Sequence, residues 1–263
     1  MIPAVLETGR RMGQLVETTV HDGGIHEIRL ARAPVNALNP ALCVALREAI
    51  MQAQADGARG IILSGGPKAF TAGLDVPHLI TLDAGALRDA WEGFFLAARA
   101  LAESPVPVVA ALNGHAPAGG CVLALCCDYR VMAAGAYFIG LNETQVGLVA
   151  PEGIQQLMQR VVGAHRAERM LVAGEMVDAQ RALEIGLVDE LADLDAVPAR
   201  AREWLAGLLA LPGKPMLTTR AIARADVVAA LQPERIGIDR FIAAWNDPDT
   251  QTALRALVAR LGK

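Results

Sequence analysis

The chain has 263 residues, a formal net charge of −4 and a hydrophobic content of 53%, of which little is aromatic. This length suffices for one large domain, or for a domain with a smaller appendage. The acidic balance, without a basic tail or stripe, argues against nucleic acid as a partner. The longest apolar run, at 116–127, is shorter than the roughly 18 residues of a membrane span, and residues 1–13 lack a signal-peptide core. We therefore expect a cytoplasmic protein with no membrane partner.

Strands and helices alternate along the first half of the chain. Two strands, at 14–19 and 25–30, flank a turn at 21–24 and predict a β-hairpin. Asn39 then caps a helix that Pro40 opens and whose apolar residues recur with helical spacing. The later apolar segments predict strands at 60–64, 108–112, 129–132 and 137–140, and helices at 84–102 and 119–127. This alternation favours an α/β fold with a largely parallel sheet.

Beyond Glu152 strand patterns become rare, and helices dominate. We expect helices at 153–161, 164–173, 178–185, 194–210, 215–230 and 235–261, separated by glycine or proline. A boundary near residue 195 divides the chain into a core, 1–195, and a C-terminal helical region, 196–263. The four cysteines, at positions 43, 121, 126 and 127, have neither disulfide nor metal spacing, so we expect reduced core residues.

Two loops that follow strands carry candidate functional groups. The loop 68–75, Lys-Ala-Phe-Thr-Ala-Gly-Leu-Asp, matches neither a P-loop nor a dinucleotide motif. The loop 117–120, Pro-Ala-Gly-Gly, opens a helix, where exposed N–H groups favour negative charge. One N–H group from each loop would suit a carbonyl oxygen on which charge develops. Glu143 follows about two dozen residues later and is a candidate acid/base. The pattern indicates chemistry at a carbonyl.

These loops together resemble those of the crotonase, or enoyl-CoA hydratase/isomerase, superfamily. The resemblance covers nearly the whole chain, from Pro-Val-Asn-Ala-Leu at 34–38 to the C-terminal helices. It implies a crotonase-type core, a superhelical spiral of ββα units, followed by a C-terminal α-helical trimerisation region. It also implies an acyl-CoA substrate, of which coenzyme A is a part, no metal or other cofactor, and a homotrimer or a hexamer.

Within that superfamily, three segments resemble Δ3,Δ2-enoyl-CoA isomerases: Pro-Ala-Gly-Gly-Cys at 117–121, Cys-Asp-Tyr-Arg at 127–130 and Ile-Gly-Leu-Asn-Glu-Thr-Gln at 139–145. The resemblance makes the N–H groups of Leu74 and Gly119 the oxyanion hole for the thioester. It makes Glu143 the acid/base. Burial of Glu143 beside its apolar neighbours is expected to raise the pKa of its carboxyl group.

Val122 departs from the pattern of the related hydratases, which have a second catalytic Glu at the aligned position. Addition of water is helped by two carboxylates, and Val122 supplies none. Moving a double bond from C3 to C2 needs only one carboxylate, which removes a proton at C2 and returns it at C4. Position 122 therefore favours isomerisation over hydration.

The resemblance also implies the substrate contacts. Residues 72–76 (Ala72, Gly73, Leu74, Asp75 and Val76) would bind the CoA arm and the thioester, Gly119 the carbonyl, and Asn142 would lie beside the base. In this family the helix containing Phe241 and Trp245 helps to line the acyl tunnel, although both residues suit an ordinary core equally well.

The sequence thus predicts a Δ3,Δ2-enoyl-CoA isomerase that forms trans-2-enoyl-CoA from 3-enoyl-CoA in fatty acid β-oxidation. One alternative is hydration or another acyl-CoA reaction on the same fold, with Glu152 or bound water compensating for Val122. Taken alone, Glu152 at a helix start is better explained as a favourable charge beside the helix dipole. The other alternative is a non-catalytic acyl-CoA-binding protein.

Overall fold

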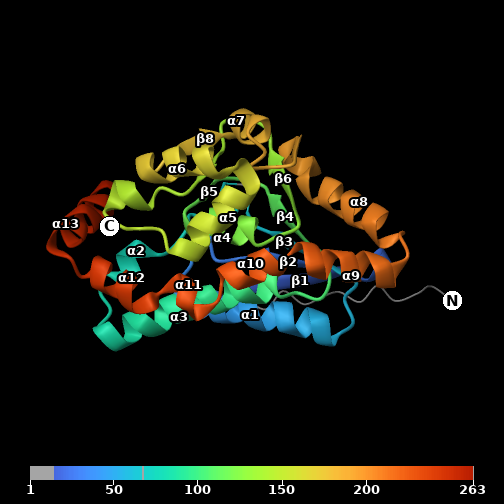
Figure 1. The fold of residues 1–263 in the computed structure, drawn as a ribbon, viewed down its shortest axis with the longest axis horizontal. Coiled ribbons are helices and arrows are strands. Elements are labelled where there is room, and N and C mark those ends of the chain that lie inside the picture. Colours follow the sequence, from blue (N-terminus) through green and yellow to red (C-terminus); the bar gives the residue numbers. More distant parts are fainter. Residues whose placement is uncertain (1–14, 67, 263) are drawn as a thin grey trace.

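The computed structural model describes residues 15–66 and 68–262, and its strands form two sheets (Figure 1). The larger has the order β1-β2-β3-β4-β6-β9. Its strands are β1 (Val16–His21), β2 (Ile25–Leu30), β3 (Gly60–Ser64), β4 (Val108–Leu112), β6 (Tyr129–Ala133) and β9 (Glu190–Ala192). Only β1 runs antiparallel to its neighbour. The smaller has the order β5-β7-β8 and contains β5 (Ala116–Pro117), β7 (Phe138–Gly140) and β8 (Met176–Asp178).

Successive side chains of the central strands point to opposite faces of the larger sheet, so both faces carry buried apolar residues. In β3, Ile61 and Leu63 face the main core, whereas Ile62 faces a second cluster. The main core includes α1 (Pro40–Ala55) and α3 (Ala84–Ala102), which pack side by side (Figure 1). The second cluster forms under α8 (Val197–Leu209). The predicted α/β architecture with a parallel sheet is therefore confirmed.

The expected hairpin forms, with a 3-10 turn at Asp22–Gly24. Its first strand begins at Val16, and the predicted start at Gln14 lies outside the described residues. All four cysteines are buried thiols, as predicted, and burial raises the pKa of each. Within 15–66 and 68–262, no helix is both long and apolar enough to cross a membrane.

The second half contains mainly helices, as expected. Besides α8 they are α5 (Glu152–Val162), α6 (Ala164–Ala173), α7 (Ala179–Glu184), α9 (Gly213–Ala223), α10 (Ala225–Ala230), α11 (Pro233–Ile236), α12 (Ile238–Trp245) and α13 (Pro248–Arg260), and the short helix α4 (Gly119–Leu125) precedes them. Two long predicted helices are wrong. The one at 215–230 breaks at Arg224. The one at 235–261 is three helices, because Gly237 is left-handed with φ of 59° and Asp247 caps a new helix that Pro248 opens.

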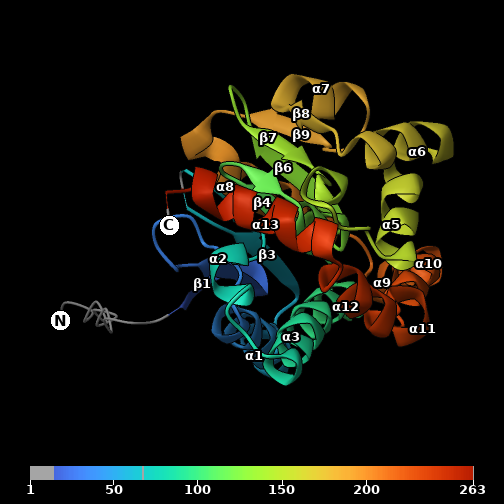
Figure 2. The ribbon, with the colours of Figure 1, turned by 90° about the vertical axis from the view of Figure 1, so that its left-hand side faces the viewer.

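The last helix returns to the core. Helix α13 packs against α12 and against α2 (Val76–Leu79), as the turned view shows (Figure 2). It also contacts the 3-10 turn η2 (Glu143–Val146). Thus α13 covers the region where the glycine loop of 68–75 meets the turn of Glu143. The boundary at residue 195 stays a prediction.

Candidate active site

The two glycine loops meet because they follow neighbouring parallel strands, β3 and β4. Their approach is close enough to require glycine. A Cβ atom on Gly73, whose φ is 78°, would lie 3.1 Å from the Pro117 carbonyl oxygen and 3.5 Å from the Gly119 nitrogen. A Cβ atom on Gly120 would lie 2.9 Å from the Thr71 methyl carbon. The glycines thus place the two backbone segments side by side.

The amide of Leu74 is left available by the way its loop pairs with Leu38. The Leu38 N–H donates to the Gly73 carbonyl (2.8 Å), and the Asp75 N–H donates to the Leu38 carbonyl (3.1 Å). Leu38 thus bonds the residues on either side of Leu74, so the Leu74 N–H faces away from it. Gly119 is the first residue of α4, where N–H groups lack intrahelical acceptors. Neither amide has a protein acceptor within the described chain.

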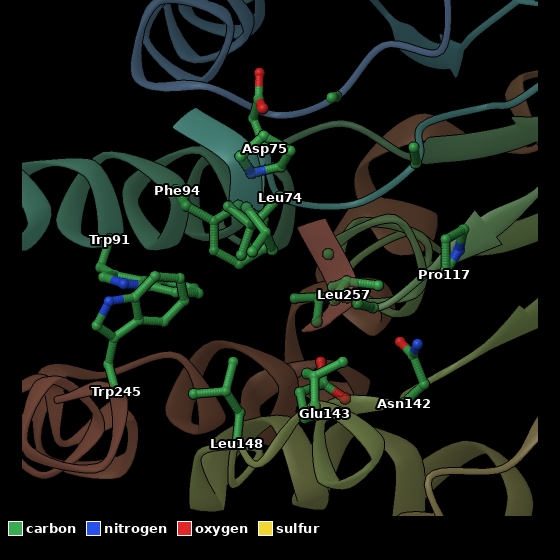
Figure 3. Close-up of a pocket in the computed structure, with 18 of the residues that line it drawn as sticks. Leu74, Asp75, Trp91, Phe94, Pro117, Asn142, Glu143, Leu148, Trp245 and Leu257 are labelled. Atoms are coloured by element: carbon green, nitrogen blue, oxygen red, sulfur yellow. The ribbon is translucent and has the colours of Figure 1, made fainter. Parts of the chain in front are cut away.

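Leu74 and Gly119 line one cavity of about 430 Å³. Its walls are mostly apolar, and Figure 3 shows Leu74 and Phe94 opposite Glu143 and Leu148, with Trp91 and Trp245 at one end. Ala118, just before α4, has φ of 45°, a region rarely used by residues with side chains. This strained backbone lies where the amide of Gly119 is presented to the cavity, and such strain often marks functional sites.

Glu143 is held at the cavity by its 3-10 turn. The Leu148 N–H donates to the Glu143 carbonyl (2.9 Å), and Gly147 ends the turn with φ of 77°. Helix α13 fixes the turn, because the Thr250 hydroxyl donates to the Gly147 carbonyl (2.7 Å). The Gln145 side chain donates to the Gly174 carbonyl (2.8 Å) beyond α6. These contacts fix the backbone of the turn that carries Glu143.

The carboxyl group of Glu143 has one oxygen without a partner. Glu143 as a residue is half-buried, but its Oε2 atom is fully buried and accepts no hydrogen bond within the described chain. Burial raises the pKa of this carboxyl from its ordinary 4.5 to about 7, and a backbone hydrogen bond within Glu143 opposes that rise more weakly. The predicted direction of the pKa shift is confirmed. A carboxyl group with this pKa can accept and release protons near neutral pH.

The described part of the cavity wall has one other acidic residue, Asp75, whose carboxylate forms contacts outside the cavity. Asp75 lines the cavity through part of its surface, but it forms an ion pair with Arg32 (2.7 Å) and caps α2 through the His78 N–H (3.3 Å). In Figure 3 its carboxyl group points away from the Glu143 side. Asp75 therefore braces the loop that presents Leu74. Among the described cavity residues, Glu143 is the one acid directed inward.

Most of the proposed substrate contacts converge here. Ala72, Val76 and Asn142 line the same cavity, and so does Val122. Gly73 is not a lining residue; it supports the loop from behind, where it meets Pro117. Their roles in binding stay predictions.

Glu152 does not reach the cavity. It is exposed at the start of α5, where it forms an ion pair with Arg235 and accepts from Gln156 (3.0 Å). The interpretation of Glu152 as a favourable charge at a helix start therefore fits the structure, whereas the hypothesis that this residue compensates for Val122 does not.

Sequence reasoning missed the part of the wall supplied by α3. Trp91, Phe94 and Phe95 line the cavity together with Phe241 and Trp245 of α12. The signal that was available is composition, because the chain has only three Trp and five Phe residues and three of these eight fall in one helical turn. Leu257 and Leu261, at the end of the chain, were missed as well.

No three His, Cys, Asp or Glu side chains of the described ranges form a group suited to a metal ion. The expectation that the reaction needs no metal or cofactor stays a prediction.

Comparison with known proteins identifies the family of the chain. The model of the enoyl-CoA hydratase/isomerase family matches residues 21–240. The mitochondrial enoyl-CoA delta isomerase 1 of Mus musculus is 32% identical over 251 residues, covering 94% of this chain and 86% of that protein. A probable enoyl-CoA hydratase of Mycolicibacterium paratuberculosis is 33% identical over 236 residues, covering 84% and 90%.

Among solved structures, human mitochondrial Δ3-Δ2-enoyl-CoA isomerase matches with a TM-score of 0.90 at 30% identity, covering 95% of this chain and 98% of that one. Fold and site therefore define an enzyme with the crotonase fold, and the predicted fold class is confirmed. The chain belongs to the enoyl-CoA hydratase/isomerase family.

Proposed function

We propose that this enzyme is a Δ3,Δ2-enoyl-CoA isomerase, which converts 3-enoyl-CoA to trans-2-enoyl-CoA in the β-oxidation of unsaturated acyl chains. One observation carries the proposal: Glu143, whose Oε2 atom accepts no hydrogen bond within the described chain, lines an apolar cavity together with Leu74 and Gly119, whose amides are unbonded. The delta isomerase names of the mouse and human relatives agree with it.

The reaction follows from these three groups. With the thioester carbonyl between the Leu74 and Gly119 amides, Glu143 removes a proton from C2. The electron pair of that C–H bond forms the C1–C2 double bond of a dienolate, and the negative charge moves to the carbonyl oxygen, which the two N–H groups stabilise. Protonated Glu143 then returns the proton at C4, the double bond settles between C2 and C3, and the carbonyl is restored. No electron acceptor and no water are consumed, so the reaction needs no cofactor.

Hydration is the second candidate, because some relatives carry hydratase names. A carboxylate at position 122 would face the same cavity as Glu143, but Val122 is apolar and only 3% exposed. Neither Asp75 nor Glu152 replaces it, since both are engaged in ion pairs. The cavity therefore supplies one proton-transferring group, which isomerisation needs, and not the pair that favours water addition.

The test is conversion of a 3-enoyl-CoA to its conjugated isomer, followed by ultraviolet absorbance, in the wild type and in Glu143→Gln. We expect turnover in the wild type and its loss in a folded variant. Water addition to crotonyl-CoA by the wild type, without isomerisation, would support the hydratase. Binding of acyl-CoA without turnover, equal in both forms, would support the non-catalytic alternative.

We also propose that the enzyme forms a trimer or a pair of trimers through the region 196–263. The support is the resemblance to a family whose members assemble in this way. Light scattering of the purified chain, compared with a chain altered at exposed C-terminal residues such as Ile222, which is 74% exposed, tests it. The mouse and human relatives are named mitochondrial, so imaging of the tagged protein in its own cells is needed to test the cytoplasmic location.

A further inference from the structure

Phe241 separates the catalytic cavity from a second cavity. It lines both the space of about 430 Å³ beside Glu143 and a neighbouring space of about 340 Å³. Phe241 itself is only 5% exposed. We propose that Phe241 is the partition that limits the length of the acyl chain, an inference that rests on the isomerase function proposed above. Removing this ring would join the two spaces and let longer chains bind.

The partition packs against Trp91, which Figure 3 shows with Trp245 as an aromatic wall at one end of the catalytic cavity. Two of the three Trp and three of the five Phe residues of the chain line this cavity. The ring of Phe241 packs edge-on against Trp91, with 4.3 Å between centroids, and Trp91 packs in turn against Trp245 at 5.6 Å. Such edge-to-face contacts hold rings in fixed orientations. The ring of Phe241 is thus packed into the wall, and an acyl chain that reaches it meets closely packed side chains.

The second cavity has a surface suited to the end of an aliphatic chain. Val149, Ala150 and Ile236 contribute apolar lining, and Ala244 lines it from α12. The ion pair of Glu152 with Arg235 also lines it, and both side chains are about half exposed, at 49% and 51%. Gln155 and Arg240 line it as well. This cavity thus opens to solvent, so an added chain end would pass between apolar side chains toward a polar outlet.

Phe95 is the rival partition. It lines the catalytic cavity and a third, smaller cavity of about 250 Å³ between α3 and α11. Two observations favour Phe241. The cavity behind it is larger, and Pro151, which follows the turn of Glu143 by only a few residues, lines both the catalytic cavity and that second space. The cavity behind Phe241 therefore borders the catalytic cavity through two described residues, whereas the cavity behind Phe95 borders it through Phe95 alone.

The experiment measures kcat/KM for straight-chain 3-enoyl-CoA thioesters of increasing length in the wild type, Phe241→Ala and Phe241→Leu. In the wild type, kcat/KM should stop rising at a limiting length. In Phe241→Ala each further buried methylene should add up to about fourfold. We therefore expect the ratio of kcat/KM between long and short substrates to rise at least tenfold. Phe241→Leu removes less volume and keeps the test available if the alanine variant does not fold.

Two further variants sharpen the test. Trp245→Phe also shortens the aromatic wall, but Trp245 does not line the second cavity, so the limiting length should not change. Ala244 lines the second cavity but not the catalytic cavity. Ala244→Phe in the Phe241→Ala background should therefore refill the second cavity and restore the limiting chain length of the wild type. A long-to-short ratio that stays within twofold of wild type in both Phe241 variants would overturn the proposal. An equal rise of this ratio in Trp245→Phe would also overturn it, and so would a rise in Phe95→Ala without one in the Phe241 variants.

Failure of the inference and failure of the function are separable. If the wild type isomerises short 3-enoyl-CoA thioesters but the Phe241 variants keep its length preference, the partition is refuted and the isomerase stands. If the wild type isomerises none of the series, the proposed function is refuted first.

Discussion

The burial of Glu143 makes the enzyme less stable at pH values above 7 than at acidic pH, and Glu143→Gln should reveal this cost. The folded pKa of about 7 is raised above the ordinary 4.5. The stability that the neutral, protonated carboxyl contributes is therefore fully present below pH 4.5 and is lost as pH rises through 7. A shift of this size corresponds to about 3 kcal/mol, at roughly 1.4 kcal/mol for each pKa unit.

Replacement of Glu143 by Gln removes the titration and leaves a neutral group of similar shape. The absolute effect on stability includes changes in packing and hydrogen bonding that do not depend on pH. The difference between variant and wild type should still move in favour of the variant by about 2.5 kcal/mol from pH 5 to pH 8. Between pH 5 and pH 8 the variant is thus expected to gain stability relative to the wild type, while it stays the less active form.

Urea unfolding at pH 5 and at pH 8, in both proteins, measures this difference. Glu168→Gln on α6 is the matched control, because its side chain is exposed; its stability difference from wild type should be nearly the same at the two pH values. If Glu143→Gln instead shifts stability by an equal amount at both, the carboxyl group is not held in an environment that disfavours its charge, and the reasoning from burial is wrong.

Three other predictions concern activity and packing. The isomerase rate should fall about tenfold for each pH unit below 7 as Glu143 is protonated, and a rate that is flat down to pH 5 would exclude it as the base. Gly119→Pro removes an oxyanion donor and should lower kcat by roughly 10²- to 10³-fold relative to Gly119→Ala, which keeps the N–H group; equal rates in the two folded variants would refute the assignment. Gly153→Ala would place a Cβ atom 1.7 Å from the Ala230 carbonyl oxygen, so thermal unfolding should occur at a clearly lower temperature, and an unchanged midpoint would contradict the close packing of α5 on α10.

The core of the site was predictable because its parts follow neighbouring strands. The loops after β3 and β4 had to emerge at one edge of the sheet, since parallel neighbours end together. This placement brought Leu74 near Gly119 without any knowledge of the packing. The identity of the two donors came from the resemblance, and the pairing of Leu38 around Leu74 gives it a physical basis.

The aromatic wall was not predictable in the same way. On α3, Trp91, Phe94 and Phe95 follow the helical spacing that also describes residues packed against a sheet. Whether such a face meets a sheet or a cavity depends on α12, which lies far away along the chain. The division of the predicted helix at 235–261 could have been predicted, because Gly237 and Pro248 are helix boundary signals in the sequence. The apolar spacing that continues across both residues favoured a single helix instead.

The fold by itself does not decide between isomerisation and hydration. A delta isomerase and a probable hydratase are similar to this chain at nearly equal identity, 32% and 33%. The difference must lie in the side chains that the shared scaffold directs into the cavity. Here Val122 removes one acid, and Arg32 engages the carboxylate of Asp75. Apolar walls then raise the pKa of the remaining acid, Glu143, to about 7. The walls that exclude a second carboxylate thus also give the first one the basicity that the proposed proton transfer between C2 and C4 requires.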